Sequence, residues 1–205
     1  MKRPPWDQLI ARKLIHYFDQ LPITPNQITL FTLVLALFGA AMLAVDNTSY
    51  ANLGAGLFVL SRFLDHFDGE LARTKGMTSR LGYYLDYTSG AISYCALFVC
   101  LGIRYSQTEL GFWSIVLGTS GAISAIISMF TNLSLDKHLK LENEKDAVGY
   151  PGYGGFELED GIYLIAPITW FGYLMPFFIA AGIGATIYCL WTIKSLIISR
   201  KGRLL

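Results

Sequence analysis

The sequence predicts an all-α, polytopic membrane protein, and its composition carries most of that prediction. Of the 205 residues, 53% are apolar and only 15% are charged, whereas about 25% are charged in an ordinary soluble domain. The mean hydropathy is +0.44, and several apolar stretches approach the roughly 20 residues that a helix needs to cross a bilayer. The 16 Lys and Arg residues nearly balance the 15 Asp and Glu residues, which argues against nucleic-acid binding because nucleic-acid-binding proteins usually carry a basic excess.

Residues 1–22 are expected to hold an amphipathic helix that lies in the membrane interface. Apolar residues recur there at helical spacing among polar ones, and Trp6 and Tyr17 suit the depth of the lipid head groups. Pro22 should end this helix, and Thr24-Pro25-Asn26 prepares the turn into the membrane.

Six transmembrane helices are expected from the apolar stretches that follow. Four stretches predict single spans: 27–45, 51–64, 82–103 and 111–135. The apolar run 161–198 is too long for one span and too short for two comfortable ones. Pro167, the Phe171–Tyr173 segment and Pro176 predict a break in that run, so we expect a short fifth helix and a longer sixth.

The basic residues predict the orientation of these helices. With six spans, nearly all Lys and Arg residues lie on one side, and only Arg104 lies in the opposite loops. Positive charge favours the cytoplasmic side, so both termini should be cytoplasmic, in a bacterial-type inner membrane. We expect a single integral membrane domain over 1–205, with an interfacial helix at 1–22, a six-helix bundle at 23–198 and a basic tail at 199–205.

Three aspartates lie at the cytoplasmic ends of the second and third predicted spans, where acids are costly. Asp65 and Asp68 share one helix face, and Asp86 lies on the next helix. Two antiparallel helices would bring the three carboxylates together, and their repulsion in a low dielectric predicts a bound cation. Mg²⁺ or Mn²⁺ prefers such oxygen ligands and often also holds substrate phosphates. Arg62, one turn before Asp65, could pair with it or with a lipid phosphate, and a structural ion pair with Asp65 is the expected use.

The stretch from Asp65 to Gly90 resembles the signature of the CDP-alcohol phosphotransferase family, which is D-x2-D-G-x2-A-R-x8-G-x3-D-x3-D. The chain matches seven of its eight fixed positions at the correct spacing. Six helices, an N-terminal interfacial helix and the Thr24-Pro25-Asn26 sequence are also similar to the family. The resemblance extends over nearly the whole chain.

This resemblance implies that the chain is an enzyme of phospholipid or related membrane-lipid synthesis. It would transfer the phosphoryl-alcohol group of a CDP-linked alcohol or CDP-diacylglycerol to an acceptor and release CMP. Asp65, Asp68 and Asp86 would be the ligands of two Mg²⁺ or Mn²⁺ ions, with Asp86 also among the catalytic residues because it is placed to bridge them. The residues expected around the nucleotide are Gly69, Ala72, Arg73 and Gly82.

Gly90 stands at the eighth position, where the family has an aspartate that acts as a metal ligand and general base. Losing a positioned base typically costs about 10²–10⁴-fold in rate, and three hypotheses account for the change. In the first, Glu157, Glu159 or Asp160, which follow a Gly-rich segment, supplies the base from a lid, although these acids could equally cap the fifth helix. In the second, the acceptor is already ionised, as a phosphate monoester is. In the third, the chain is a non-catalytic nucleotide or lipid binder.

Two further expectations concern assembly and an alternative class of protein. Gly39, Gly118 and Gly121 are small residues that suit close helix contacts, so a homodimer, as in the family, is expected. A small transporter would also use intramembrane acids, but it would place them near the bilayer midplane, often within inverted repeats. Metal-dependent release of CMP would separate these two classes.

Overall fold

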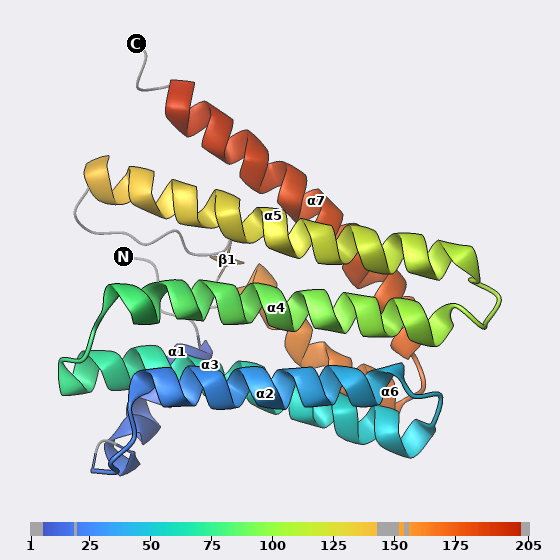
Figure 1. Cartoon of the computed structure of the whole chain (residues 1–205), viewed down its shortest axis with the longest axis horizontal. Coiled ribbons are helices and arrows are strands. Elements are labelled where there is room, and N and C mark those ends of the chain that lie inside the picture. The colour runs from blue at the N-terminus through green and yellow to red at the C-terminus, as the bar shows by residue number, and fades with distance from the viewer. Residues whose placement is uncertain (1–5, 19, 143–151, 154–155, 202–205) are drawn as a thin grey trace.

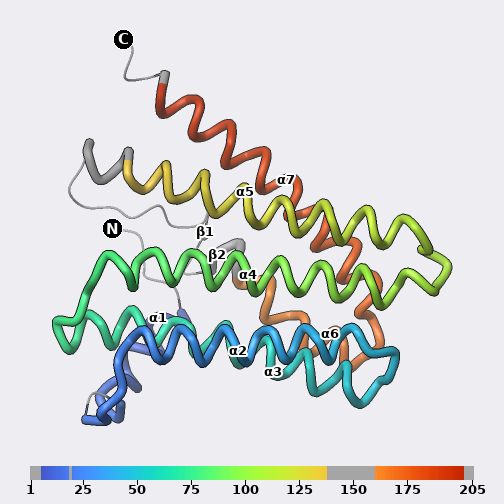
Figure 2. The backbone as a smooth tube through the Cα atoms, viewed as in Figure 1, coloured from blue at the N-terminus to red at the C-terminus, as the bar shows by residue number. Residues whose placement is uncertain are grey.

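The computed structural model describes residues 6–18, 20–142, 152–153 and 156–201 (Figures 1 and 2). The all-α prediction is confirmed, apart from a hairpin in which β1 (Gly152–Tyr153) pairs antiparallel with β2 (Phe156–Glu157). The long helices are α2 (Pro25–Ala44), α3 (Thr48–Lys75), α4 (Arg80–Tyr105), α5 (Phe112–Glu142) and α7 (Leu174–Lys201). The shorter helices are α1 (Trp6–Leu14), the 3-10 helices η1 (Ile15–Tyr17) and η2 (Leu158–Leu164), and α6 (Ile165–Trp170).

Four helices of the described chain are long and apolar enough to cross a bilayer, namely α2, α4, α5 and α7. Helix α3 has 28 residues, but charged residues interrupt its second half. Helix α6 has only six residues, or about 9 Å of helix. Large apolar side chains such as Phe31, Phe130 and Leu190 point outward, as lipid contact requires. These features describe an integral membrane protein.

Local sequence signals set the ends of α2 and α3. Thr24 and Gln27 form a capping box, in which the Thr24 N–H donates to Gln27 Oε1 at 2.9 Å and the Gln27 N–H donates to Thr24 Oγ1 at 3.4 Å. Asn47 Oδ1 caps α3 by accepting from two backbone N–H groups. Gly76 ends α3 at φ +65°, a left-handed conformation that glycine adopts at little cost.

The break in the last apolar run falls at residues 171–173, between the end of α6 and the start of α7. Gly172 has φ +83° there, which explains why the chain can turn at this point. Helices α2 to α5 run in alternating directions, and α7 runs in the same direction as α5 (Figure 1). As a result, α1, the start of α2 and the ends of α3, α5 and α7 lie at the same end of the bundle. This end also carries Lys75 and Arg80, the terminal residues of α3 and α4.

Helices α2 and α3 pack so closely that their glycines face backbone atoms. A Cβ atom on Gly39 would lie 2.8 Å from Gly54 O, and one on Gly54 would lie 2.6 Å from Gly39 O. Large buried side chains such as Leu43 and Phe58 fill the adjoining core. Further along the bundle, Gly118 of α5 faces Phe98 O of α4 in the same way, and Gly121 of α5 faces the Phe98 ring. The small residues that favoured a homodimer are thus used in contacts within one chain.

Asp7 ties α1 to the rest of the bundle. Its buried carboxylate contacts His66 Nε2 of α3 at 2.8 Å and accepts a hydrogen bond from Tyr163 OH of η2 at 2.9 Å. The rings of Trp6 and Tyr163 also meet edge to face, 5.2 Å apart. Burial alone would raise the pKa of Asp7, but His66 and the donors Tyr163 and the Gln8 N–H outweigh it and hold this pKa below its usual value.

Replacing Asp7 by asparagine is expected to lower the free energy of unfolding by about 1–3 kcal/mol near pH 7, because a buried, partnered charge is lost. A carboxyl group with a lowered folded pKa gives stability that is present above its unfolded pKa, about 3.9, and is lost as the pH falls through the folded pKa. Thermal unfolding in micelles should therefore separate variant and wild type at pH 7, and the difference should shrink as the pH falls below about 4. Equal stability at pH 7 would contradict this role.

Candidate metal and nucleotide site

The structure brings together the three aspartates that the sequence singles out. Asp65 and Asp68 extend from α3 and Asp86 from the first turns of α4, and one carboxylate oxygen of each lies within 4.8 Å of the others. We call these three residues the aspartate cluster. The side chains of Asp65 and Asp68 are buried, whereas that of Asp86 is exposed. A ligand can therefore reach the aspartate cluster from the Asp86 side.

Two threonines of α2 hold the buried members of this cluster. Thr32 Oγ1 donates to Asp65 Oδ1 at 2.9 Å, and Thr29 Oγ1 donates to Asp68 Oδ2. Both threonines are 2% exposed. Each hydroxyl also lies within hydrogen-bond distance of a backbone oxygen of α2, Pro25 O for Thr29 at 3.2 Å and Thr29 O for Thr32 at 2.9 Å. Sequence reasoning missed them, although two hydroxyls spaced i, i+3 in an apolar span face one side of the helix and could have pointed to the site.

Arg62 adds a positive charge beside the aspartate cluster. Its Nη1 atom lies 2.9 Å from Asp65 Oδ2, which confirms the expected ion pair, and Arg62 is only 8% exposed. The guanidinium also lies over the Tyr94 ring of α4, with Cζ 5.2 Å from the ring centroid. Both oxygens of Asp65 therefore have a protein donor.

The residues expected around a nucleotide line the same end of α3 and α4. A Cβ atom on Gly82 would lie 3.0 Å from Asn26 Oδ1, so a larger residue would press on the start of α2. Gly69 faces the Arg73 guanidinium at ordinary contact distance. Arg73 is exposed and pairs with Glu70 at 2.8 Å, and its guanidinium can also meet a phosphate. Ala72 is half-buried on the same helix.

Gly90 leaves open space where the resemblance expects an aspartate. A Cβ atom at this position would meet no atom of the described residues within 4 Å. The predicted replacement bases are only partly described: Glu157 ends β2 and Glu159 lies in η2, but their side chains lie outside the described residues. Asp160 is half-buried in η2, three residues before Tyr163.

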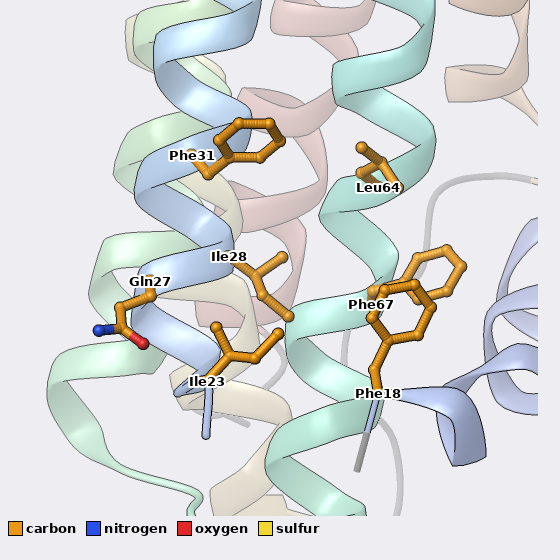
Figure 3. Close-up of a pocket in the computed structure, with 7 residues that line it drawn as sticks. All are labelled: Phe18, Ile23, Gln27, Ile28, Phe31, Leu64 and Phe67. Atoms are coloured by element: carbon orange, nitrogen blue, oxygen red, sulfur yellow. The ribbon is translucent and has the colours of Figure 1, made fainter. Parts of the chain in front are cut away.

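An apolar pocket of about 350 Å³ lies between α2 and α3 (Figure 3). It is lined by residues of α2, α3 and the segments beside them, and Gln27 is its polar member. The lining residues are Phe18, Ile23, Gln27, Ile28, Phe31, Leu64 and Phe67. Leu64 and Phe67 each precede a cluster aspartate by one residue and so project about 100° away from it.

The donor set of the aspartate cluster fits a hard divalent cation. Carboxylate oxygens are the ligands that Mg²⁺ prefers and that Mn²⁺ accepts. The threonine hydroxyls fix the orientation of two ligands, as outer contacts do in metal sites. The cluster alone carries three negative charges close together, and a divalent cation would offset two of them.

Replacing Thr29 or Thr32 by valine is expected to weaken Mn²⁺ binding about 10- to 100-fold, because outer contacts that orient metal ligands typically contribute that much. The shape of the side chain is kept, so the fold should survive. Thr186→Val in α7 is the matched control, since the Thr186 hydroxyl donates only to the backbone of its own helix, at 3.0 Å. Isothermal titration with Mn²⁺ measures the effect, and unchanged affinity in both variants would show that the hydroxyls do not support the site.

This fold and site define a helical membrane protein with a carboxylate centre at one end of its bundle. The family model of the CDP-alcohol phosphatidyltransferases matches residues 22–193, and the chain belongs to that family. Its fold is similar to that of a phosphatidylinositol phosphate synthase from Mycobacterium tuberculosis, solved with CDP-DAG bound. The TM-score is 0.64 at 19% sequence identity, and the match covers 93% of each chain.

Curated relatives match over shorter stretches. An uncharacterized protein of Aquifex aeolicus is 33% identical over 103 residues, which are 50% of this chain and 51% of that protein. An archaetidylinositol phosphate synthase of Pyrococcus horikoshii is 32% identical over 94 residues, 44% and 48% of the two chains. A ceramide phosphoethanolamine synthase of Drosophila melanogaster is 36% identical over 90 residues, 40% of this chain and 22% of that enzyme. The matches thus span about half or less of these relatives.

Proposed function

We propose that the chain transfers a phosphoryl-alcohol group from a CDP-linked donor to an acceptor and releases CMP, in a reaction that needs a divalent cation. The observation that carries this proposal is the aspartate cluster, whose oxygens converge within 4.8 Å from two helices. The family supports phospholipid head-group transfer. The names of the relatives, which are synthases of phosphorylated lipids, support a lipid product.

The residues of the site divide the work. A bound Mg²⁺ or Mn²⁺ would neutralise charge on the diphosphate and on the departing CMP. Asp65, Asp68 and Asp86 would hold the cation, and Arg73 would contact a phosphate oxygen. Gly69, Ala72 and Gly82 keep the approach to the cluster free of bulky side chains, so that the nucleotide can lie against α3 and α4.

The membrane arrangement is part of the same proposal. We infer six crossings, with α3 and the η2–α6 segment added to the four apolar helices, because the chain direction alternates through all six. Helix α1 would then lie in the interface, and the end of the bundle that carries Lys75, Arg80 and Arg200 would face the cytoplasm. A homodimer rests on the resemblance to the family alone, since Gly39 and Gly118 pack within the chain.

The base that an aspartate at position 90 would supply is proposed to come from Glu157, Glu159 or Asp160. The contact between Tyr163 and Asp7 connects η2 to α3, because Asp7 also binds His66 of that helix. Residues three apart in a 3-10 helix eclipse one another, so Asp160 shares a face with Tyr163. Single changes to the amides should abolish turnover in one case, and full activity in all three would contradict the proposal.

Release of CMP by the purified chain in micelles tests the function. With Mg²⁺ and a lipid acceptor mixture, the chain should release CMP from radiolabelled CDP-diacylglycerol or from CDP-ethanolamine, and EDTA should stop the release. The donor that releases CMP shows whether the nucleotide carries the diacylglycerol or the head group of the product. If release needs a phosphorylated acceptor, the acceptor and not the chain supplies the ionised group. If neither donor yields CMP, the chain is a binder or a transporter, and titration with CDP-diacylglycerol separates those two.

A further inference from the structure

One face of α4 meets two different features of α3. Asp86, Gly90 and Tyr94 are spaced four residues apart and so form one stripe along α4. At one end of the stripe, Asp86 joins the aspartate cluster. At the other end, Tyr94 carries the guanidinium of Arg62 over its ring. Gly90 therefore lies on this stripe between Asp86 and Tyr94, and a Cβ atom there would meet no described atom within 4 Å.

The net charge of the side chains around the proposed metal site differs from the net charge that the family signature would give. Four aspartates carry four negative charges, which two divalent cations balance. In this chain the three carboxylates and Arg62 together carry two negative charges, which one divalent cation balances. The guanidinium is fixed in this place, because it is 8% exposed, lies 2.9 Å from Asp65 Oδ2 and stacks on Tyr94.

We propose that the Arg62 guanidinium takes the place of a second metal ion, so that the site holds a single divalent cation. An arginine can do this because it is permanently charged and presents donors that match phosphate and carboxylate oxygens. Its contact with Asp65 Oδ2, together with the Thr32 hydroxyl on Asp65 Oδ1, gives both oxygens of Asp65 a protein donor. This inference rests on the proposed metal-dependent function. It reduces the two metal ions that the resemblance implies to one.

The number of bound Mn²⁺ ions tests this directly. Equilibrium dialysis of the purified full chain in micelles, followed by elemental analysis, should give about one Mn²⁺ per chain. Its paramagnetic resonance spectrum should show isolated ions, without the coupling of a close pair. The double variant Gly90→Asp/Arg62→Gln should gain a second, coupled ion, whereas Gly90→Asp alone should stay at one because the new carboxylate pairs with Arg62.

Affinity provides a second measurement that needs only one substitution. Arg62→Gln should bind Mn²⁺ about tenfold more tightly or better, since a competing cation leaves Asp65, whereas Arg62→Lys should stay close to the wild type. Two coupled ions in the wild type, or an unchanged affinity in Arg62→Gln, would overturn the inference. Two ions together with release of CMP would leave the proposed function intact, whereas a wild type that binds no Mn²⁺ and releases no CMP would overturn both.

Discussion

Asp68→Asn is expected to reduce CMP release about a thousandfold or more, because a metal site that stabilises the transition state contributes several kcal/mol to the rate. The same change should not destabilise the metal-free protein. Like charges about 5 Å apart repel by on the order of 3 kcal/mol at an effective dielectric constant near 20, and the substitution removes one member of the aspartate cluster. Thr29 can still donate to the amide oxygen at position 68.

Two measurements on the same samples separate these effects. Thermal unfolding without metal should place the variant at or above the wild-type midpoint, and addition of Mg²⁺ should raise the midpoint of the wild type only. Asp46→Asn is the matched control, because Asp46 is exposed and pairs with Arg104 at the other end of α4, at 3.3 Å. A variant at Asp68 that keeps most of its activity would remove the cluster from the mechanism.

Much of the site could be predicted from the sequence because the residues that form it lie close together along the chain. The spacing of Asp65 and Asp68 places them on one helix face in any α-helix, and the short connection to α4 returns Asp86 to the same end. The end of α3 at Gly76 and the break at Gly172 follow from glycines with positive φ, which are visible as glycines in the sequence. Helical periodicity and turn-forming residues act over only a few positions, so they can be recognised in the sequence without knowing the fold.

The remaining parts depend on contacts between distant segments. Thr32 lies 33 residues from Asp65, and Asp7 lies 156 residues from Tyr163. From the sequence alone, each of these polar residues could have several roles, such as a helix cap or an exposed surface group. Only the packing of α2 and α1 against α3 selects the partner. The choice among Glu157, Glu159 and Asp160 has the same origin, since it depends on where β2 and η2 lie relative to the cluster.

The packing of α2 on α3 also leads to the prediction with the largest expected effect on the fold. Gly54→Leu should prevent the two helices from meeting, because even a Cβ atom there would lie 2.6 Å from Gly39 O and 2.9 Å from Met42 Cβ. The milder Gly54→Ala should cost about 1–3 kcal/mol of unfolding free energy, as overpacking does in a well-packed core. Helix α2 carries Thr29 and Thr32, so moving it should also weaken Mn²⁺ binding.

Gly184→Ala in α7 separates crowding from the general effect of adding a methyl group. A Cβ atom on Gly184 would meet no described atom within 4 Å, and alanine favours a helix by up to about 1 kcal/mol over glycine. This control should therefore be neutral or stabilising, and its Mn²⁺ affinity should not change. Thermal unfolding and Mn²⁺ titration of the two alanine variants give the comparison. If Gly54→Ala matches Gly184→Ala in both, the close approach of α2 and α3 does not hold the site together.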